Sequence, residues 1–184
     1  MKTLYRNPDD NLTDTLVDGL IDNMGYSDFN VLFPETDAVK PNDGVDYKWF
    51  LPAYTGLGME SELSAIKQYT TQSALYGAVS TELMSIAMVE MRHYDKLGDL
   101  ILKLGGTLDK DWNTTQVEYG KTEKEALSIA IKSEKAAIKF YKDLQNKINN
   151  IKEKTPTTEI CIEFLSKLIA DETLHLKILE GIKI

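Results

Sequence analysis

Apolar positions recur at helical spacing through most of the chain after residue 58. Between residues 81 and 104, the inward-facing positions follow alternating steps of three and four residues. This spacing places side chains on one face of an α-helix. The same spacing recurs in three other segments, so we expect an all-α protein. The expected helices cover residues 59–76, 81–104, 122–149 and 157–182.

Capping and stop signals bound these expected helices. Gly105-Gly106 is a typical end for the second helix. Thr122-x-x-Glu125 has the form of a capping box before the third helix. Pro156 stands at the start of the fourth helix, where proline is tolerated.

The first 55 residues differ in composition from the rest of the chain. They contain four of the five prolines, which interrupt helices, so only one short helix is expected here, over residues 12–24. We therefore expect residues 1–55 to form an N-terminal arm laid over one domain. That domain, residues 56–184, has a typical single-domain size.

Each apolar stripe contains a glutamate on its inward face, and two stripes also contain a histidine three residues later. A lone glutamate or histidine in such a stripe is usually a core residue with a local hydrogen bond. The chain has only two histidines, however, and both follow a glutamate at this spacing, which favours a shared site. The inward-facing polar residues are Glu62, Glu90, His93, Glu134, Glu172 and His175.

Hairpin geometry predicts that these residues meet at one level. Residues equidistant from the turn lie side by side in a pair of antiparallel helices. The midpoint of Glu62 and Glu90 is residue 76, and that of Glu134 and Glu172 is residue 153. Both midpoints fall in expected turns, so the carboxylates of each hairpin should face each other.

A short internal duplication relates the two hairpins. Residues 61–69 are similar to residues 133–141, and each half contains one Glu-x-x-His pair. We therefore expect an antiparallel four-helix bundle with a crossover connection between its second and third helices, at residues 106–120.

Four buried carboxylates at one level require cations, because burying an unpaired carboxylate is costly. Two divalent ions balance four carboxylates when the imidazoles are neutral. Oxygen-rich ligation with one imidazole per ion suits iron, or manganese as the alternative, better than metals that prefer thiolates. We interpret the terminal ligands as Glu62 and Glu134, the bridging ligands as Glu90 and Glu172, and the residues that complete one ion each as His93 and His175.

Three further residues are candidates for supporting roles around the ions. Asp171, four residues before His175, can orient an imidazole. Tyr69 and Tyr141 can hydrogen-bond to ligands or supply electrons, and simple packing is the alternative for both. Other residues near the stripes are interpreted as packing residues: Met84, Met88, Met91 and Cys161.

Composition narrows the partners and the location. The formal net charge of -8 repels nucleic acid and anionic membrane surfaces. No apolar run reaches the roughly 18 residues that a membrane span needs, and the start shows no signal-peptide pattern. We therefore expect a cytoplasmic protein. Its single cysteine provides no Cys-x-x-Cys redox module, so we expect a separate electron donor.

The order Glu62, Glu90-x-x-His93, Glu134, Glu172-x-x-His175 resembles the ferritin-like superfamily, which includes ferritins, bacterioferritins, rubrerythrins and manganese catalases. The resemblance covers residues 56–182. It implies a di-iron or di-manganese protein that reacts with hydrogen peroxide or dioxygen in defence against oxidative stress. Two features depart from rubrerythrins: Ala137 stands where they carry an additional glutamate, and no rubredoxin domain is encoded.

Two other functions stay open at this point. One is a ferroxidase or iron-storage protein, and the other is a catalytically inactive bundle that keeps metal for stability. The extended N-terminal arm is unlike a subunit that packs into a large shell. We therefore expect a homo-oligomer, with a homodimer as the favoured form.

Overall fold

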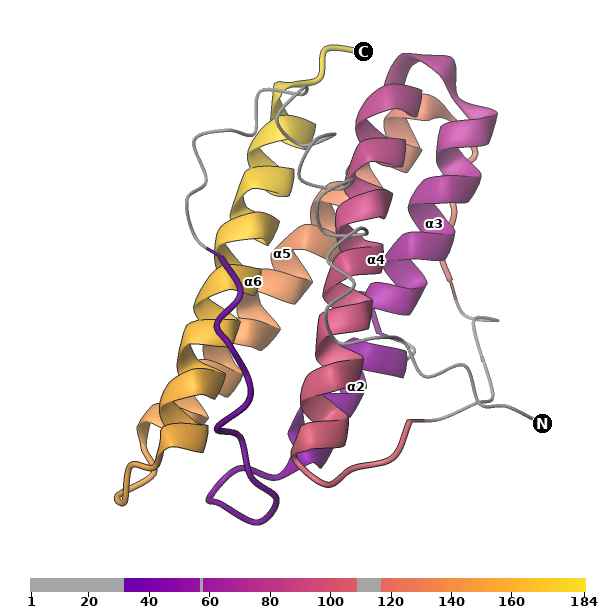
Figure 1. The fold of residues 1–184 in the computed structure, drawn as a ribbon. Helices are drawn as coiled ribbons and strands as arrows, with labels where there is room; N and C mark the ends of the chain where they lie inside the picture. Colours follow the sequence, from indigo (N-terminus) through magenta and orange to yellow (C-terminus); the bar gives the residue numbers. More distant parts are fainter. Residues whose placement is uncertain (1–31, 57, 109–116) are drawn as a thin grey trace, which may run out of the picture. The chain divides into compact units, whose positions relative to one another are not determined.

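Four long helices form the bundle in the part of the chain that the computed structural model describes, residues 32–56, 58–108 and 117–184 (Figure 1). All four coincide with helices expected from the apolar spacing, which confirms an all-α fold. The largest difference is at the first helix, which starts at Glu62 because the side chain of Ser61 caps it. The helices are α3 (Glu62–Leu75), α4 (Ser80–Lys103), α5 (Glu123–Asn149) and α6 (Pro156–Gly181).

The end of α4 follows the expected glycine signal. Gly105 adopts a φ of 84°, which glycine tolerates well. The backbone N–H groups of Gly105 and Gly106 donate to the carbonyls of Leu102 and Ile101, at 3.0 and 2.9 Å. These two bonds satisfy carbonyls that the last turn of a helix otherwise leaves unpaired.

The starts of α5 and α6 contain the expected residues, with one correction. Thr122 accepts a hydrogen bond from the Glu125 N–H at 3.2 Å. The Glu125 carboxylate, however, accepts from the N–H of Lys121 rather than from that of Thr122. The expected capping box is therefore only half formed, since the returning bond satisfies a donor one residue earlier. Pro156 is the first residue of α6, and Thr155 caps it.

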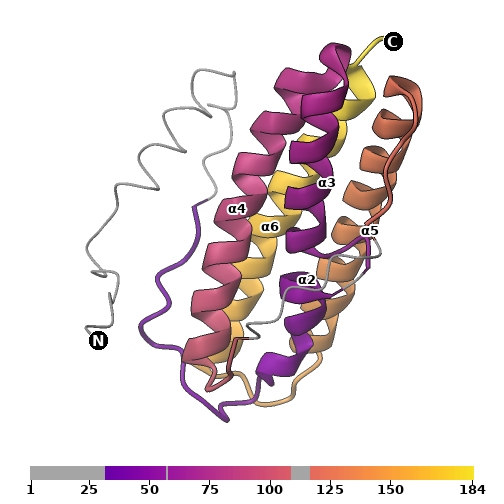
Figure 2. The same cartoon turned by 90° about the vertical axis from the view of Figure 1, so that its right-hand side faces the viewer.

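The helices pair as two hairpins, α3 with α4 and α5 with α6, as both views show (Figures 1 and 2). The start of α5 lies beside the turn between α3 and α4. There the Tyr76 hydroxyl donates to the Gly120 carbonyl at 2.7 Å, and the Ala78 N–H donates to Glu123 at 3.1 Å. Because α4 also starts at this turn, α4 and α5 run in the same direction. Their connection therefore crosses the length of the bundle, as expected.

Residues 39–55 contain two short helices that were not expected from the sequence, η1 (Tyr47–Trp49) and α2 (Leu51–Thr55). The segment packs against the bundle. We expected proline to interrupt helices here. Pro52 instead lies in the first turn of α2, where a backbone N–H is not needed. Phe50 is fully buried in a cluster shared with α4, α5 and α6. The helix expected at residues 12–24 lies outside the described residues, and the division into arm and bundle stays a prediction.

Among the described residues, the buried apolar side chains form two clusters with a polar layer between them. One cluster joins residues 39–54 to the ends of α4 and α5 and the start of α6, and it includes Leu97 and Leu165. The other lies at the start of α4 and the end of α6, and it includes Leu83 and Leu179. The predicted site residues fall between these clusters along α4, α5 and α6, so apolar side chains enclose them on two sides.

The apolar surface differs from expectation at the methionines. Met84 and Met91 expose 40% and 45% of their surface, so the packing role expected for these two residues is wrong. Cys161 is fully buried, as expected, and burial raises the pKa of its thiol to about 12. Among the described residues, every helix is too short or too polar to cross a membrane.

Candidate metal centre

All six predicted site residues come together at one level of the bundle. The turns of the two hairpins, at η2 (Gly77–Val79) and between Asn149 and Pro156, lie close to the expected midpoints. Each side chain points inward, and none of the six residues is more than 2% exposed. They are Glu62 on α3, Glu90 and His93 on α4, Glu134 on α5, and Glu172 and His175 on α6.

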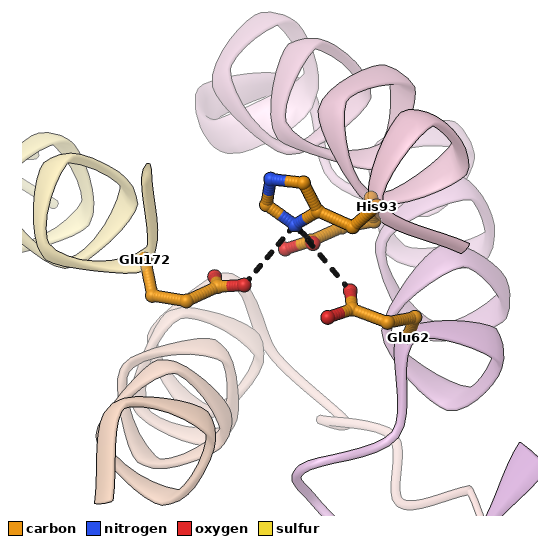
Figure 3. A group of neighbouring side chains, drawn as sticks. Glu62, His93 and Glu172 are labelled. Atoms are coloured by element: carbon orange, nitrogen blue, oxygen red, sulfur yellow. Dashed lines mark hydrogen bonds and ion pairs between the residues drawn. The ribbon is translucent and has the colours of Figure 1, made fainter. Parts of the chain in front are cut away.

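The first group of candidate ligand atoms surrounds Nδ1 of His93 (Figure 3). This nitrogen lies 2.9 Å from Glu90 Oε2, 3.1 Å from Glu172 Oε1 and 3.6 Å from Glu62 Oε2. A ring nitrogen carries at most one hydrogen, so hydrogen bonding alone does not account for three carboxylates around it. One ligand atom from each of these four residues lies within 4.8 Å of the others.

A second group has the same composition on the other side of the layer. Nδ1 of His175 lies 3.1 Å from Glu172 Oε2, 3.2 Å from Glu90 Oε1 and 3.5 Å from Glu134 Oε2. These four residues also place one ligand atom each within 4.8 Å of the others. The duplicated hairpins therefore produce two equivalent sets of one imidazole and three carboxylates.

Two carboxylates belong to both groups, and we call them the shared carboxylates, Glu90 and Glu172. Each turns one oxygen toward His93 and the other toward His175. The remaining two, Glu62 and Glu134, each face a single group, and we call them the outer carboxylates. The geometry thus separates the four glutamates into the same two pairs that the sequence analysis proposed as bridging and terminal ligands.

The donor set fits two cations. Oε2 of Glu134 and Oε1 of Glu172 are buried and accept no hydrogen bond within the described part of the chain. An unsatisfied buried carboxylate oxygen is destabilising. The Nδ1 atoms of His175 and His93 lie 3.5 and 3.1 Å from these two oxygens, respectively. One cation in each group would bind both oxygens, and two divalent ions would balance the four carboxylates. The buried carboxylate and histidine clusters therefore fit a di-metal site.

Tyr69 and Tyr141 contact the outer carboxylates from the opposite helix. Tyr69 on α3 donates a hydrogen bond to Glu134 on α5, and Tyr141 on α5 donates one to Glu62 on α3. Both tyrosines are fully buried. The two bonds correspond to each other through the internal duplication. The hydrogen-bonding role thus describes these tyrosines better than the packing alternative.

Asp171 contacts the imidazole of the other hairpin. Its Oδ2 lies 3.0 Å from Nε2 of His93, and its Oδ1 lies 2.5 Å from the Lys167 ammonium. Spacing within the sequence does not indicate which imidazole Asp171 orients. The corresponding residue of the first hairpin, directly before Glu90, is Val89, which has no side-chain acceptor. The group around His93 therefore differs from the group around His175 at a residue outside the ligand set, because Asp171 corresponds to Val89 in the duplication.

The charges within the layer set the protonation of its groups. Burial, reinforced by the charges of the shared carboxylates, raises the pKa of both outer carboxylates well above the usual value. Burial alone would lower the pKa of His93 and His175, but the surrounding carboxylates outweigh it and raise both pKa values well above the usual one. The two imidazoles in turn hold the pKa of each shared carboxylate below its usual value, against the effect of burial.

Two residues next to the centre escaped the sequence analysis. Lys167 is only 6% exposed and pairs with Asp171, and its spacing of four residues from Asp171 was the available signal. Phe33 packs edge-on against His93, with 6.1 Å between the ring centroids. Nothing in the sequence around Phe33 indicates this contact, because it depends on how the segment before α2 lies on the bundle.

A family model described as a ferritin-like domain matches residues 59–183. This range contains all four long helices and all six candidate ligands. No curated protein matches the chain.

Proposed function

The chain belongs to the ferritin-like domain family, and we propose that it is a di-iron or di-manganese oxidoreductase that acts on hydrogen peroxide or dioxygen. The observation that carries this proposal is the position of the shared carboxylates, Glu90 and Glu172, which each face both histidines. Two ions held in this way can act together on one small substrate.

The ligand types support the choice of metal. Each ion would be held by one imidazole nitrogen and by oxygens of one outer and two shared carboxylates. Such oxygen-rich sets favour iron or manganese over metals that prefer thiolates. When bound, two ions that each change oxidation state by one supply the two electrons that reduce hydrogen peroxide to water.

The buried tyrosines hold protons beside the outer carboxylates. Burial, together with the nearby carboxylate charges, raises the pKa of Tyr69 and Tyr141 well above the usual value, so both phenols stay protonated. Their O–H groups fix the positions of Glu134 and Glu62. They also keep a proton within reach of the space where a peroxide oxygen would become water.

Asp171 prepares His93 for binding an ion. When Oδ2 of Asp171 accepts the proton of Nε2, the neutral imidazole has its lone pair on Nδ1, the atom that faces the carboxylates. Hydrogen bonds from His93 and Lys167 hold the pKa of Asp171 below its usual value despite burial. Asp171 therefore remains an acceptor at neutral pH.

Repeated turnover would require electrons from a separate donor. The only cysteine, Cys161, lies in the apolar core and cannot form a redox pair within the chain. We propose that a partner protein or a small reductant supplies the electrons, and that the protein works as a homodimer.

Metal loading and turnover together test this proposal. Protein supplied with iron and manganese should bind about two ions per chain and consume hydrogen peroxide when a reductant is present. Glu90→Ala/His93→Ala should lose both properties. Glu163→Ala, at an exposed glutamate of α6, should keep them. Shell-sized particles that accumulate iron would instead indicate storage, and bound metal without turnover would indicate a structural bundle.

A further inference from the structure

A small cavity opens onto the candidate metal centre between α3 and α5. Its volume is about 10 Å³, close to the minimum that one water molecule needs. All four glutamates of the centre line the cavity, but neither histidine does. Met59 and Glu60, from the turn before α3, are half-buried and also line it. The cavity therefore approaches the centre from its carboxylate side and leads toward the surface.

Corresponding residues of the two hairpins form much of this cavity. The similarity of residues 61–69 to residues 133–141 relates its lining residues in pairs, and three such pairs contribute. The pairs are Ser61 and Ser133, Glu62 and Glu134, and Ala65 and Ala137.

The alanine pair forms part of the cavity wall. Each alanine lies three residues after an outer carboxylate, so its methyl group lies on the same helix face one turn further along. Any longer side chain at Ala65 or Ala137 would extend into a space that holds only about one water molecule.

The carboxylates of the centre line this space. Oε2 of Glu134 and Oε1 of Glu172 accept no hydrogen bond among the described residues, and both glutamates line the cavity. A small polar molecule there would meet carboxylate oxygens and the hydroxyl-bearing Tyr69, which also lines it. Besides the half-buried Glu60, the remaining lining is apolar or hydroxylic, so nothing in it is suited to a large anionic substrate.

We propose that this cavity is the entrance and binding place of the small oxidant, and that Ala65 and Ala137 determine the size of molecule that reaches the ions. The inference rests on the proposed function, because it assigns the substrate route of the same centre. Hydrogen peroxide and dioxygen, with two heavy atoms each, are admitted. Alkyl hydroperoxides with branched carbon groups are excluded.

Nitric oxide, a diatomic probe, tests the route without turnover. In protein loaded with iron(II), its binding is followed by absorption after the iron content of each sample is measured. Ala137→Leu should slow or weaken this binding at least about tenfold, equal to about 1.4 kcal/mol. Ala65→Leu should do the same and serves as a second variant, because Ala65 is half-buried and tolerates a larger side chain better.

Ala136→Leu is the matched control, since Ala136 neighbours Ala137 on α5 but does not line the cavity. Its nitric oxide binding should stay within about twofold of the wild type, which is under 0.5 kcal/mol. Iron-loaded Ala137→Leu and Ala65→Leu proteins that bind nitric oxide like the wild type would overturn this inference alone. A wild type that binds neither iron nor manganese would overturn the proposed function and the inference with it.

Discussion

Metal binding should release protons from the centre. In the metal-free protein the pKa values of His93 and His175 lie well above the usual one, so both imidazoles are charged at neutral pH. Each must lose one proton before its Nδ1 lone pair can bind an ion. The outer carboxylates, Glu62 and Glu134, also have raised pKa values and can release up to one proton each. We expect about two to four protons per chain for two ions.

This proton release determines whether the affinity for metal ions rises or falls with pH. Because protons leave when ions bind, lowering the pH opposes binding. One to two protons per ion correspond to a Kd that falls about 10- to 100-fold between pH 6 and pH 7, since each released proton contributes a factor of ten per pH unit.

Anaerobic titration calorimetry with Mn²⁺ measures the effect. The same titration at pH 7 in two buffers with different ionisation enthalpies gives the number of protons released. Glu163→Ala, an exposed change, should match the wild type, whereas Glu90→Ala/His93→Ala should bind no ion with comparable affinity. Two bound ions with no proton release, or tighter binding at pH 6 than at pH 7, would refute the reasoning.

Three further changes test individual contacts. Asp171→Leu removes the acceptor of His93 Nε2 and should weaken the binding of one of the two ions about 10- to 100-fold in a metal titration. Wild-type affinities for both ions would contradict this. Tyr141→Phe removes the donor to Glu62 and should lower the free energy of unfolding in urea by about 1–2 kcal/mol; an unchanged midpoint would argue against the bond. Gly105→Ala should cost about 1–2 kcal/mol because φ is 84° and the new Cβ would lie 2.9 Å from Pro41. Gly77→Ala, in open space, should cost clearly less.

The helices and the six candidate ligands could be located from the sequence because both depend on local rules. Steps of three and four residues define the buried face of a helix, and the distance from a hairpin turn defines the level at which Glu62 meets Glu90. The grouping of the four glutamates into two pairs followed from the duplication, since a residue of α4 and its counterpart in α6 must occupy equivalent places.

Contacts between the hairpins could not be predicted in the same way. Asp171 contacts His93 across the bundle, and this depends on how α6 is rotated against α4 rather than on spacing within either helix. Phe33 reaches His93 from a segment with no periodicity. Pro52 was misleading, because the same residue interrupts a helix in its middle and starts one at its first turn.

An anomalous X-ray map of crystals loaded with iron or manganese tests the central claim most directly. We predict two peaks in each chain, one beside His93 and one beside His175, both in contact with Glu90 and Glu172. A single peak, or two peaks that do not share these carboxylates, would contradict the di-metal account.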